Sequence, residues 1–117
     1  MSSIRKAPQL VMYDVGCRLP NNLTLTLAHA KKMGFNSVRV GPFLKNSRNP
    51  YAVMDHKTIA PELLAANVSL SPEEQLRTVI ETGHREGLAV IMDLPSIHTS
   101  VEHPLVKEHP EWYLQIR

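Results

Sequence analysis

The chain has 117 residues, the size of one ordinary globular domain or of part of a larger one. A hydrophobic content of 43% and a charged content of 21% are typical of a folded globular protein and argue against intrinsic disorder. The 13 basic and 11 acidic residues are interspersed and give a formal net charge of +2, so no nucleic-acid partner is indicated.

Cysteine usage and the lack of long apolar runs indicate the cellular compartment. Cys17 is the single cysteine, so no intramolecular disulfide can form, and a reducing compartment is the simpler assumption. The start, MSSIRKAPQL, has a basic pair without the apolar run of a signal peptide. No stretch approaches the roughly 20 apolar residues of a membrane span. The sequence therefore predicts a cytoplasmic protein with no membrane partner.

The first part of the chain predicts a strand, a helix and a second strand. Residues 10–17, LVMYDVGC, form a short apolar run with β-favouring residues, ended by RLPNN. Residues 23–34 place apolar side chains at helical spacing after Asn22 as an N-cap, although the Leu-Thr alternation at their start also fits a strand. Residues 35–43, FNSVRVGPF, form the second predicted strand, which the Gly-Pro pair ends.

The rest of the chain predicts a long loop, a helix, a third strand and a polar tail. Residues 44–70 contain three proline-bounded pieces and no sustained period, and a loop of that length usually carries function. A helix with a capping box at its start follows over residues 71–87. Residues 88–94, LAVIMDL, are apolar almost throughout, as strands covered on both faces must be. Residues 96–117 form the polar tail.

This alternation predicts an α/β fold with parallel strands. Each strand–helix–strand unit is a right-handed crossover connection that packs its helix outside the sheet. In such sheets the ligand side is the carboxyl end of the strands. Asp93 and His98 lie at that end of the third strand, and so does the long loop after the second. A carboxylate at the end of an apolar strand needs a partner or a ligand.

Three segments, taken in order, resemble one known family. They are LAHAKKMGFNSVRVGPFLKN, NPYAVMDHKTIAPEL and SPEEQLRTVIETGHREGLAVIMDLPSIHTSVEHPLVKEHPEWY. Together they resemble the first three β/α units of the α-amylase superfamily, glycoside hydrolase family 13. The family strand motif D-x-V-x-N-H is matched at its first and last positions by Asp93 and His98. The family loop pattern Y-x-V-x-D-Y-x-x-V-x-P-E-x-G is matched at Tyr51, Val53, Asp55, Pro61 and Glu62.

The resemblance implies a partial (β/α)8 TIM barrel. Residues 1–117 would be the N-terminal portion of its catalytic domain, and residues 96–117 would begin the loop after the third strand. A complete barrel takes about 250 residues, so the chain supplies roughly three of eight units. The family places its catalytic residues on the fourth, fifth and seventh strands. The resemblance therefore implies no catalytic residue in this chain, and leaves open whether the chain alone is an enzyme.

The resemblance also implies a substrate-binding site. Tyr51 would offer a flat face on which a pyranose ring stacks, and His98 would hydrogen-bond a glucosyl hydroxyl. Asp93 would lie beside the sugar, a role compatible with hydrogen bonding to backbone at the strand end. From the residues alone, Tyr51 could also be a loop aromatic that covers the core, and His98 a surface histidine.

No metal ion or cofactor is predicted. Where the family usually has Asn before the motif histidine, a position that often binds calcium in amylases, this chain has Ile97. The spacing of His98, His103 and His109 matches no zinc pattern. The tail HPLVKEHPEWY resembles the DHPW and HPEWF elements of the maltosyltransferase branch, which builds α-glucan from maltose 1-phosphate. Trp112 in this tail is expected to pack against a part of the barrel that the chain lacks.

Two classes of function remain open from the sequence. In the first, the chain is the N-terminal part of an enzyme acting on α-glucans, either a glycoside hydrolase or a glucanosyl- or maltosyltransferase, and is inactive alone. In the second, it is a small non-catalytic binding or interaction module derived from such a barrel. An α-glucan or maltooligosaccharide is the expected ligand. The open strand edges predict a homo-oligomer or a complex with a complementary barrel fragment.

Overall fold

A computed structural model describes residues 9–65 and 69–114 of the chain. Residues 1–8, on which part of the expectation about a targeting segment rests, lie outside this description. Residues 66–68 of the predicted loop and residues 115–117 of the tail also lie outside it. Among the described residues, no helix is both long enough and apolar enough to cross a membrane.

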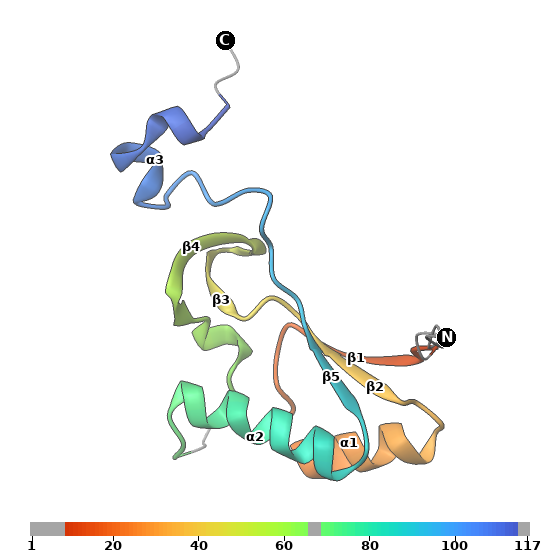
Figure 1. Ribbon diagram of the computed structural model, residues 1–117. Helices are drawn as coiled ribbons and strands as arrows, with labels where there is room; N and C mark the ends of the chain where they lie inside the picture. Colours follow the sequence, from red (N-terminus) through yellow and green to blue (C-terminus); the bar gives the residue numbers. More distant parts are fainter. Residues whose placement is uncertain (1–8, 66–68, 115–117) are drawn as a thin grey trace, which may run out of the picture.

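The three predicted strands form one sheet. They are β1 (Met12–Gly16), β2 (Ser37–Val40) and β5 (Ala89–Met92), and β2 lies between the other two (Figure 1). Both pairings are parallel, with Val38 beside Tyr13 on one side and Val90 on the other. The prediction of an α/β fold with parallel strands is therefore confirmed.

Two helices connect these strands and lie side by side (Figure 1). The first is α1 (Leu23–Lys32), whose N-cap Asn22 accepts a hydrogen bond from the backbone N–H of Leu25 at 3.1 Å. The helical interpretation of this segment is thus correct, and its Leu-Thr alternation does not produce a strand. The second is α2 (Pro72–Arg85), which begins at the predicted capping box and leads into β5.

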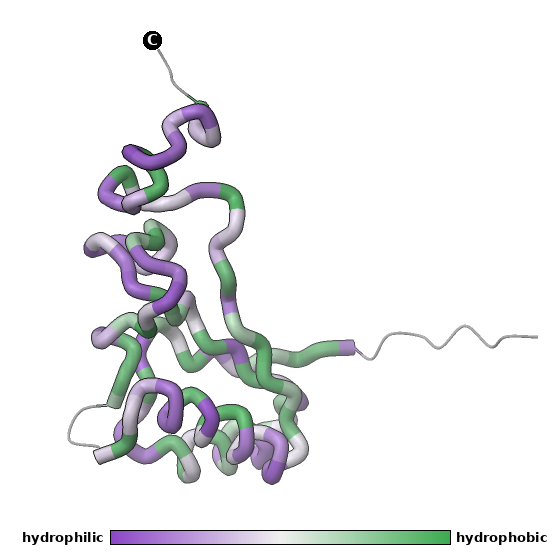
Figure 2. The backbone as a smooth tube through the Cα atoms, turned by 60° about the vertical axis from the view of Figure 1, so that its left-hand side comes forward, coloured by the Kyte–Doolittle hydropathy of each residue, from purple (hydrophilic) through white to green (hydrophobic). Residues whose placement is uncertain are grey.

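Two clusters of buried side chains hold the helices against the sheet. The first packs α1 onto the strands and comprises Leu27, Ala30, Val38 and Leu88. The second packs α2 onto the carboxyl half of β2 and comprises Leu19, Val40, Ala60, Leu63 and Val79. Figure 2 shows the hydrophobic residues along the sheet strands and, alternating with hydrophilic ones, along the helices. Because Val38 and Val40 both face this core, Arg39 between them faces away from it.

The segment predicted as a loop over residues 44–70 contains regular structure, so that prediction is wrong in part. β3 (Leu44–Ser47) and β4 (Asn49–Ile59) form an antiparallel hairpin, and a 3₁₀ turn, η1 (Pro61–Leu63), follows. The 11 residues of β4 oppose only 4 residues of β3, and the pairing register shifts between every successive pair. Such bulges destroy the two-residue alternation by which a strand is recognised in sequence.

The polar tail also contains short helical turns that the sequence did not predict. These are α3 (Leu105–Glu108) and the 3₁₀ turn η2 (Pro110–Trp112), which lie beyond the hairpin in Figure 1. The backbone N–H of Ser100 donates to the carbonyl of Val53 at 2.8 Å and ties the tail to β4. The radius of gyration is 17.3 Å, whereas a compact domain of this length has about 13 Å. The described structure is therefore open rather than closed on itself.

Replacement of Ser71 by alanine is expected to lower the free energy of unfolding by about 1 kcal/mol. The Ser71 hydroxyl accepts from the Glu74 backbone N–H at 3.2 Å, and the Glu74 carboxylate accepts from the Ser71 N–H at 2.7 Å. Hydrogen bonding of the Glu74 carboxylate to the Ser71 backbone N–H, and then to the Ser71 side chain, holds the pKa of Glu74 below its usual range. Urea denaturation measures the loss. Ser71→Asp keeps an acceptor and is the control, so an equal loss in both variants would contradict the capping argument.

Candidate functional site

Arg39 joins four structural elements near the carboxyl end of the sheet. Its guanidinium donates to both carboxylate oxygens of Asp14 in β1, each at 3.1 Å. It also donates to the hydroxyl of Tyr51 in β4 at 2.8 Å and to the carboxylate of Asp93, which follows β5. We call these four residues the Arg39 cluster.

The sheet register explains why these side chains meet. Asp14 and Ile91 are the neighbours of Arg39 in the two adjacent strands, so Asp14 lies on the same face as Arg39. Asp93 is two residues beyond Ile91 and therefore points to that face as well. Arg39 supplies the charged partner that the position of Asp93 at the end of an apolar strand required.

The Arg39 cluster is charged and accessible. Hydrogen bonds to Asp93 and then to Tyr51 raise the pKa of Arg39, so the guanidinium stays protonated. With both carboxylates ionised, one cation faces two anions, and the cluster carries a formal charge of −1. The exposed fractions of the side chains are 25% for Arg39, 32% for Asp93 and 60% for Asp14. A ligand can therefore reach these polar groups from solvent.

Arg39 is not among the site residues that the sequence motifs predict. The signal was present in the four residues of β2, SVRV, where an arginine stands between two valines. An arginine at such a position places a charge on the face opposite the core, where a carboxylate at the end of the neighbouring strand can pair with it. Only the three-dimensional register shows that Asp14 and Tyr51 share the same guanidinium.

His98 lies in a different hollow from the Arg39 cluster. This hollow, of about 510 Å³, is formed by the tail and is lined by Ser96, Ile97, His98, Thr99, Trp112, Tyr113 and Leu114. The structure thus brings Tyr51 and Asp93 together on one arginine and places His98 in a separate hollow that Trp112 also lines. Sugar binding by each of the three residues stays a prediction.

A further hollow, of about 530 Å³, lies between the hairpin and α3. Here Nδ1 of His56 is 2.9 Å from Nε2 of His103, whose side chain is buried. The backbone N–H of Leu105 donates to Nδ1 of His103 at 3.1 Å. Nearby, Asp55 accepts from the Thr58 hydroxyl and from the Lys57 N–H, which lowers the pKa of its carboxyl. The histidine contact joins the tail to β4, whereas the bonds of Asp55 stay within β4.

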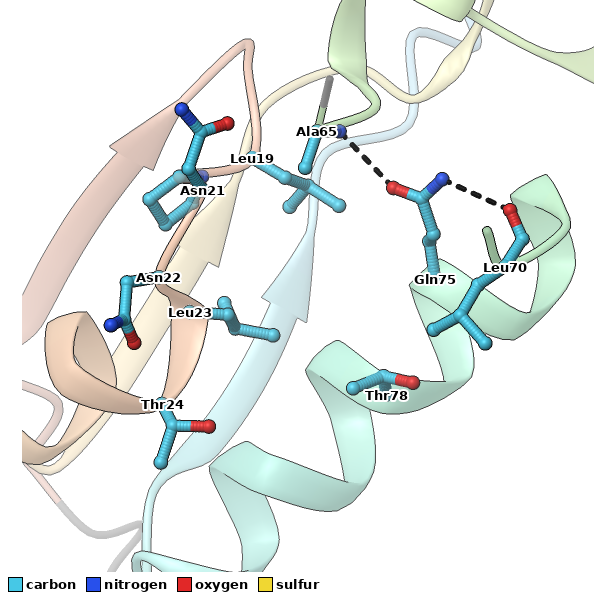
Figure 3. Close-up of a pocket in the computed structure, with 10 residues that line it drawn as sticks. Leu19, Asn21, Asn22, Leu23, Thr24, Ala65, Leu70, Gln75 and Thr78 are labelled. Atoms are coloured by element: carbon cyan, nitrogen blue, oxygen red, sulfur yellow. Dashed lines mark hydrogen bonds between the residues drawn. The ribbon is translucent and has the colours of Figure 1, made fainter. Parts of the chain in front are cut away.

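The hollow in Figure 3 lies between the segment before α1 and the start of α2 and measures about 220 Å³. The amide of Gln75, a buried side chain, points into it. Its oxygen accepts from the Ala65 N–H at 3.1 Å and its nitrogen donates to the Leu70 carbonyl at 3.3 Å. Both ends of this amide are occupied in joining α2 to the preceding loop. Within the ranges that the structure describes, no group of three or more histidine, cysteine or acidic side chains could hold a metal ion.

Known proteins similar to this chain act on α-glucans and related sugars. The model of the family "Glycogen debranching enzyme, glucanotransferase domain" matches residues 18–116. An α-1,4-glucan:maltose-1-phosphate maltosyltransferase of Cereibacter sphaeroides is 33% identical over 82 residues, which are 67% of this chain and 12% of that protein. An oligo-1,6-glucosidase of Parageobacillus thermoglucosidasius is 29% identical over 93 residues, 78% of this chain and 14% of that protein. The chain thus spans a small part of the length of these relatives.

Solved structures agree on the fold. An α-amylase from Lactobacillus plantarum superposes with a TM-score of 0.69 at 24% identity, over 91% of this chain and 27% of that one. A trehalose-6-phosphate hydrolase of Bacillus licheniformis superposes with a TM-score of 0.67 at 23% identity, over 85% of this chain and 19% of that one. The family predicted from the sequence motifs is confirmed. Because the family model matches most of its length, the chain belongs to the α-amylase superfamily, in the family of the glycogen debranching enzyme glucanotransferase domain.

Proposed function

We propose that this chain is the N-terminal portion of the (β/α)8 catalytic barrel of an enzyme that acts on α-glucans. Three parallel strands in the order β1-β2-β5 would be the first three strands of that barrel, and residues 96–117 would begin the loop after the third. Relatives that include a maltosyltransferase and a glucosidase support either transfer or hydrolysis. The single cysteine supports a cytoplasmic location.

This proposal rests mainly on the contacts within the Arg39 cluster. Tyr51 comes from the family loop pattern and Asp93 from the family strand motif, and one guanidinium hydrogen-bonds both. The Tyr51 side chain is partly exposed and its hydroxyl is fixed by Arg39, so a pyranose ring could stack on a phenol ring held in place. The carboxylates of Asp14 and Asp93 could accept hydrogen bonds from sugar hydroxyls.

The isolated chain is expected to show no turnover on maltose, maltooligosaccharides, starch or sucrose. Retaining glycosidases need two carboxyl groups about 5 Å apart, one as nucleophile and one as acid/base. The family places these residues on the fourth, fifth and seventh strands of the barrel, and this chain would supply only the first three. Product release measured against a blank checks this. Activity that survives repurification and is lost in an Asp93→Ala variant would show that the chain catalyses on its own.

Maltooligosaccharide is expected to bind the Arg39 cluster in the millimolar range, because a partial cleft offers few contacts to offset the cost of association. In an NMR titration, chemical-shift changes of the Arg39 guanidinium resonances measure binding at this site. Tyr51→Ala should remove the shifts, whereas Tyr51→Phe keeps the stacking ring but loses the bond to Arg39 and should retain only part of the binding. Shifts at Arg39 that persist unchanged in Tyr51→Ala would place the sugar elsewhere.

A further inference from the structure

A hollow of about 330 Å³ lies between the segment that follows β1 and the turn that joins β3 to β4. Among the described residues that line it, Arg18 and Arg48 are the cations and Glu62 is the carboxylate. With two positive charges and one negative charge, these side chains carry a formal charge of +1. The Arg39 cluster has the opposite sign, so the two places suit ligands of different charge.

Arg48 adopts a backbone conformation that costs an arginine conformational energy. It is the single residue between Ser47 and Asn49, which pair with each other at the end of β3 and the start of β4, and its φ is 56°. Within the described ranges, every other residue with a positive φ is a glycine. Glycine or asparagine would fit this position with less strain. An arginine at such a position indicates a role for its side chain.

The guanidinium of Arg18 is held at the hollow by the backbone of η1. Its Nε donates to the carbonyl oxygen of Glu62 at 3.3 Å, which uses one of the five N–H donors of the group. In the part of the chain that the structure describes, neither Arg18 nor Arg48 forms an ion pair with a carboxylate. The remaining donors of both arginines are therefore available to an anion in the hollow.

The lining favours a phosphate group carried on a small organic molecule. Guanidinium groups present paired N–H donors that match two oxygens of a phosphate. A phosphate ester carries a charge of about −1.5 to −2 at pH 7, which two arginines together can balance. The hollow also has an apolar floor, because Pro42, Ala60 and Leu63 line it and are buried. This floor offers a contact to the organic part of the ligand.

We propose that this hollow is a binding site for a small organic phosphate monoester, with the phosphate group held between Arg18 and Arg48. The site is separate from the Arg39 cluster. Pro50 lines the hollow and Tyr51 accepts a hydrogen bond from Arg39, and successive residues of a strand lie on opposite faces. The proposal does not depend on sugar binding at Tyr51, and the site contributes binding and no chemical step.

Alkylation of Cys17 measures occupancy of this hollow, because Cys17 is the only cysteine of the chain, is exposed and lines the hollow. Phenyl phosphate should slow the reaction of the full chain with iodoacetamide in a saturable manner. The dissociation constant should lie in the millimolar range and rise with added NaCl, because both arginines are exposed and salt screens their charge.

Two further compounds test the two parts of the ligand. Phenol supplies the ring without the phosphate and should not slow the alkylation. Inorganic phosphate lacks a group that contacts the apolar floor and should bind about 3-fold more weakly than phenyl phosphate. No slowing by phenyl phosphate, or equal slowing by phenol, would overturn the proposal. Inorganic phosphate that binds as tightly as phenyl phosphate would overturn the assignment of a monoester.

Arg48→Gly is the most informative variant, because it removes the guanidinium and also suits the positive φ. It should raise the dissociation constant for phenyl phosphate about 5- to 10-fold, while the urea midpoint stays the same or rises. Glu62→Gln removes the competing carboxylate and should lower the dissociation constant. Tyr51→Ala is the control for the Arg39 cluster and should change nothing. An Arg48→Gly variant that is folded and still protects Cys17 as the parent chain does would overturn the proposal.

Discussion

Replacement of Arg39 by methionine is expected to lower the free energy of unfolding by about 2 kcal/mol. Methionine has a similar apolar stem but no donor, so the carboxylates of Asp14 and Asp93 would face each other without a cation, and the Tyr51 hydroxyl would lose its partner. The side chains are partly exposed, so solvent screening keeps the loss below that of a fully buried ion pair. Urea denaturation measures the change.

The same substitution is expected to weaken maltooligosaccharide binding at Tyr51. Arg39 is the contact between the Tyr51 side chain and the sheet, and without it the hairpin residue would no longer be held beside Asp93. Arg39→Lys is the matched control. Lysine keeps the charge but lacks the planar guanidinium group that hydrogen-bonds Asp14, Tyr51 and Asp93 together. It should therefore recover part of the stability and little of the binding. An Arg39→Met variant that unfolds at the same urea concentration as the parent chain, and binds equally well, would show that the cluster holds nothing in place.

The isolated chain is expected to sediment as an oligomer at micromolar concentration rather than as a 13.2 kDa monomer. In the sheet that the structure describes, β1 and β5 each pair on one side only and leave an edge of unpaired backbone groups. Large apolar side chains stand exposed at both edges. They are Leu10, Val11 and Met12 at β1 and Leu94 after β5. Strand pairing with a second copy, or with a complementary barrel fragment, would cover them.

A charged side chain introduced at the β1 edge tests whether the strand edges cause the association. Val11→Lys should shift the distribution toward monomer, because an edge lysine opposes strand pairing. Leu25→Lys is the control, since Leu25 is 66% exposed on α1 and lies away from the strand edges. A monodisperse monomer with cooperative unfolding and no concentration dependence would show that the edges are covered from within the chain.

The elements that could be predicted are those whose signals are local. Helix α2 is marked by its capping box and β5 by an uninterrupted apolar run, and both lie where the sequence places them. The hairpin could not be predicted, because three shifts of register leave β3 and β4 without a regular alternation. The parallel pairing of β1, β2 and β5 followed from the crossover order and needed no knowledge of the individual contacts.

The candidate site was predictable only in part, because it depends on contacts between residues far apart in sequence. The family motifs pointed to Tyr51 and Asp93. The expectation that Asp93, a carboxylate at a strand end, needs a partner was correct. The identity of the partner, Arg39, depended on which face of β2 turns away from the core. The hollow that contains His98 depended on the 3₁₀ turn that brings Trp112 and Tyr113 back beside residues 96–99.

The contact between His56 and His103 determines where both rings carry their hydrogen. Because the Leu105 N–H donates to Nδ1 of His103, that nitrogen must present its lone pair, and the ring hydrogen of a neutral His103 resides on Nε2. Nε2 then donates to Nδ1 of His56, whose own hydrogen must also reside on Nε2. A backbone amide of α3 thus sets the tautomer of a side chain in β4. In ¹⁵N spectra of the neutral rings, both histidines should show a pyridine-like Nδ1 and a pyrrole-like Nε2.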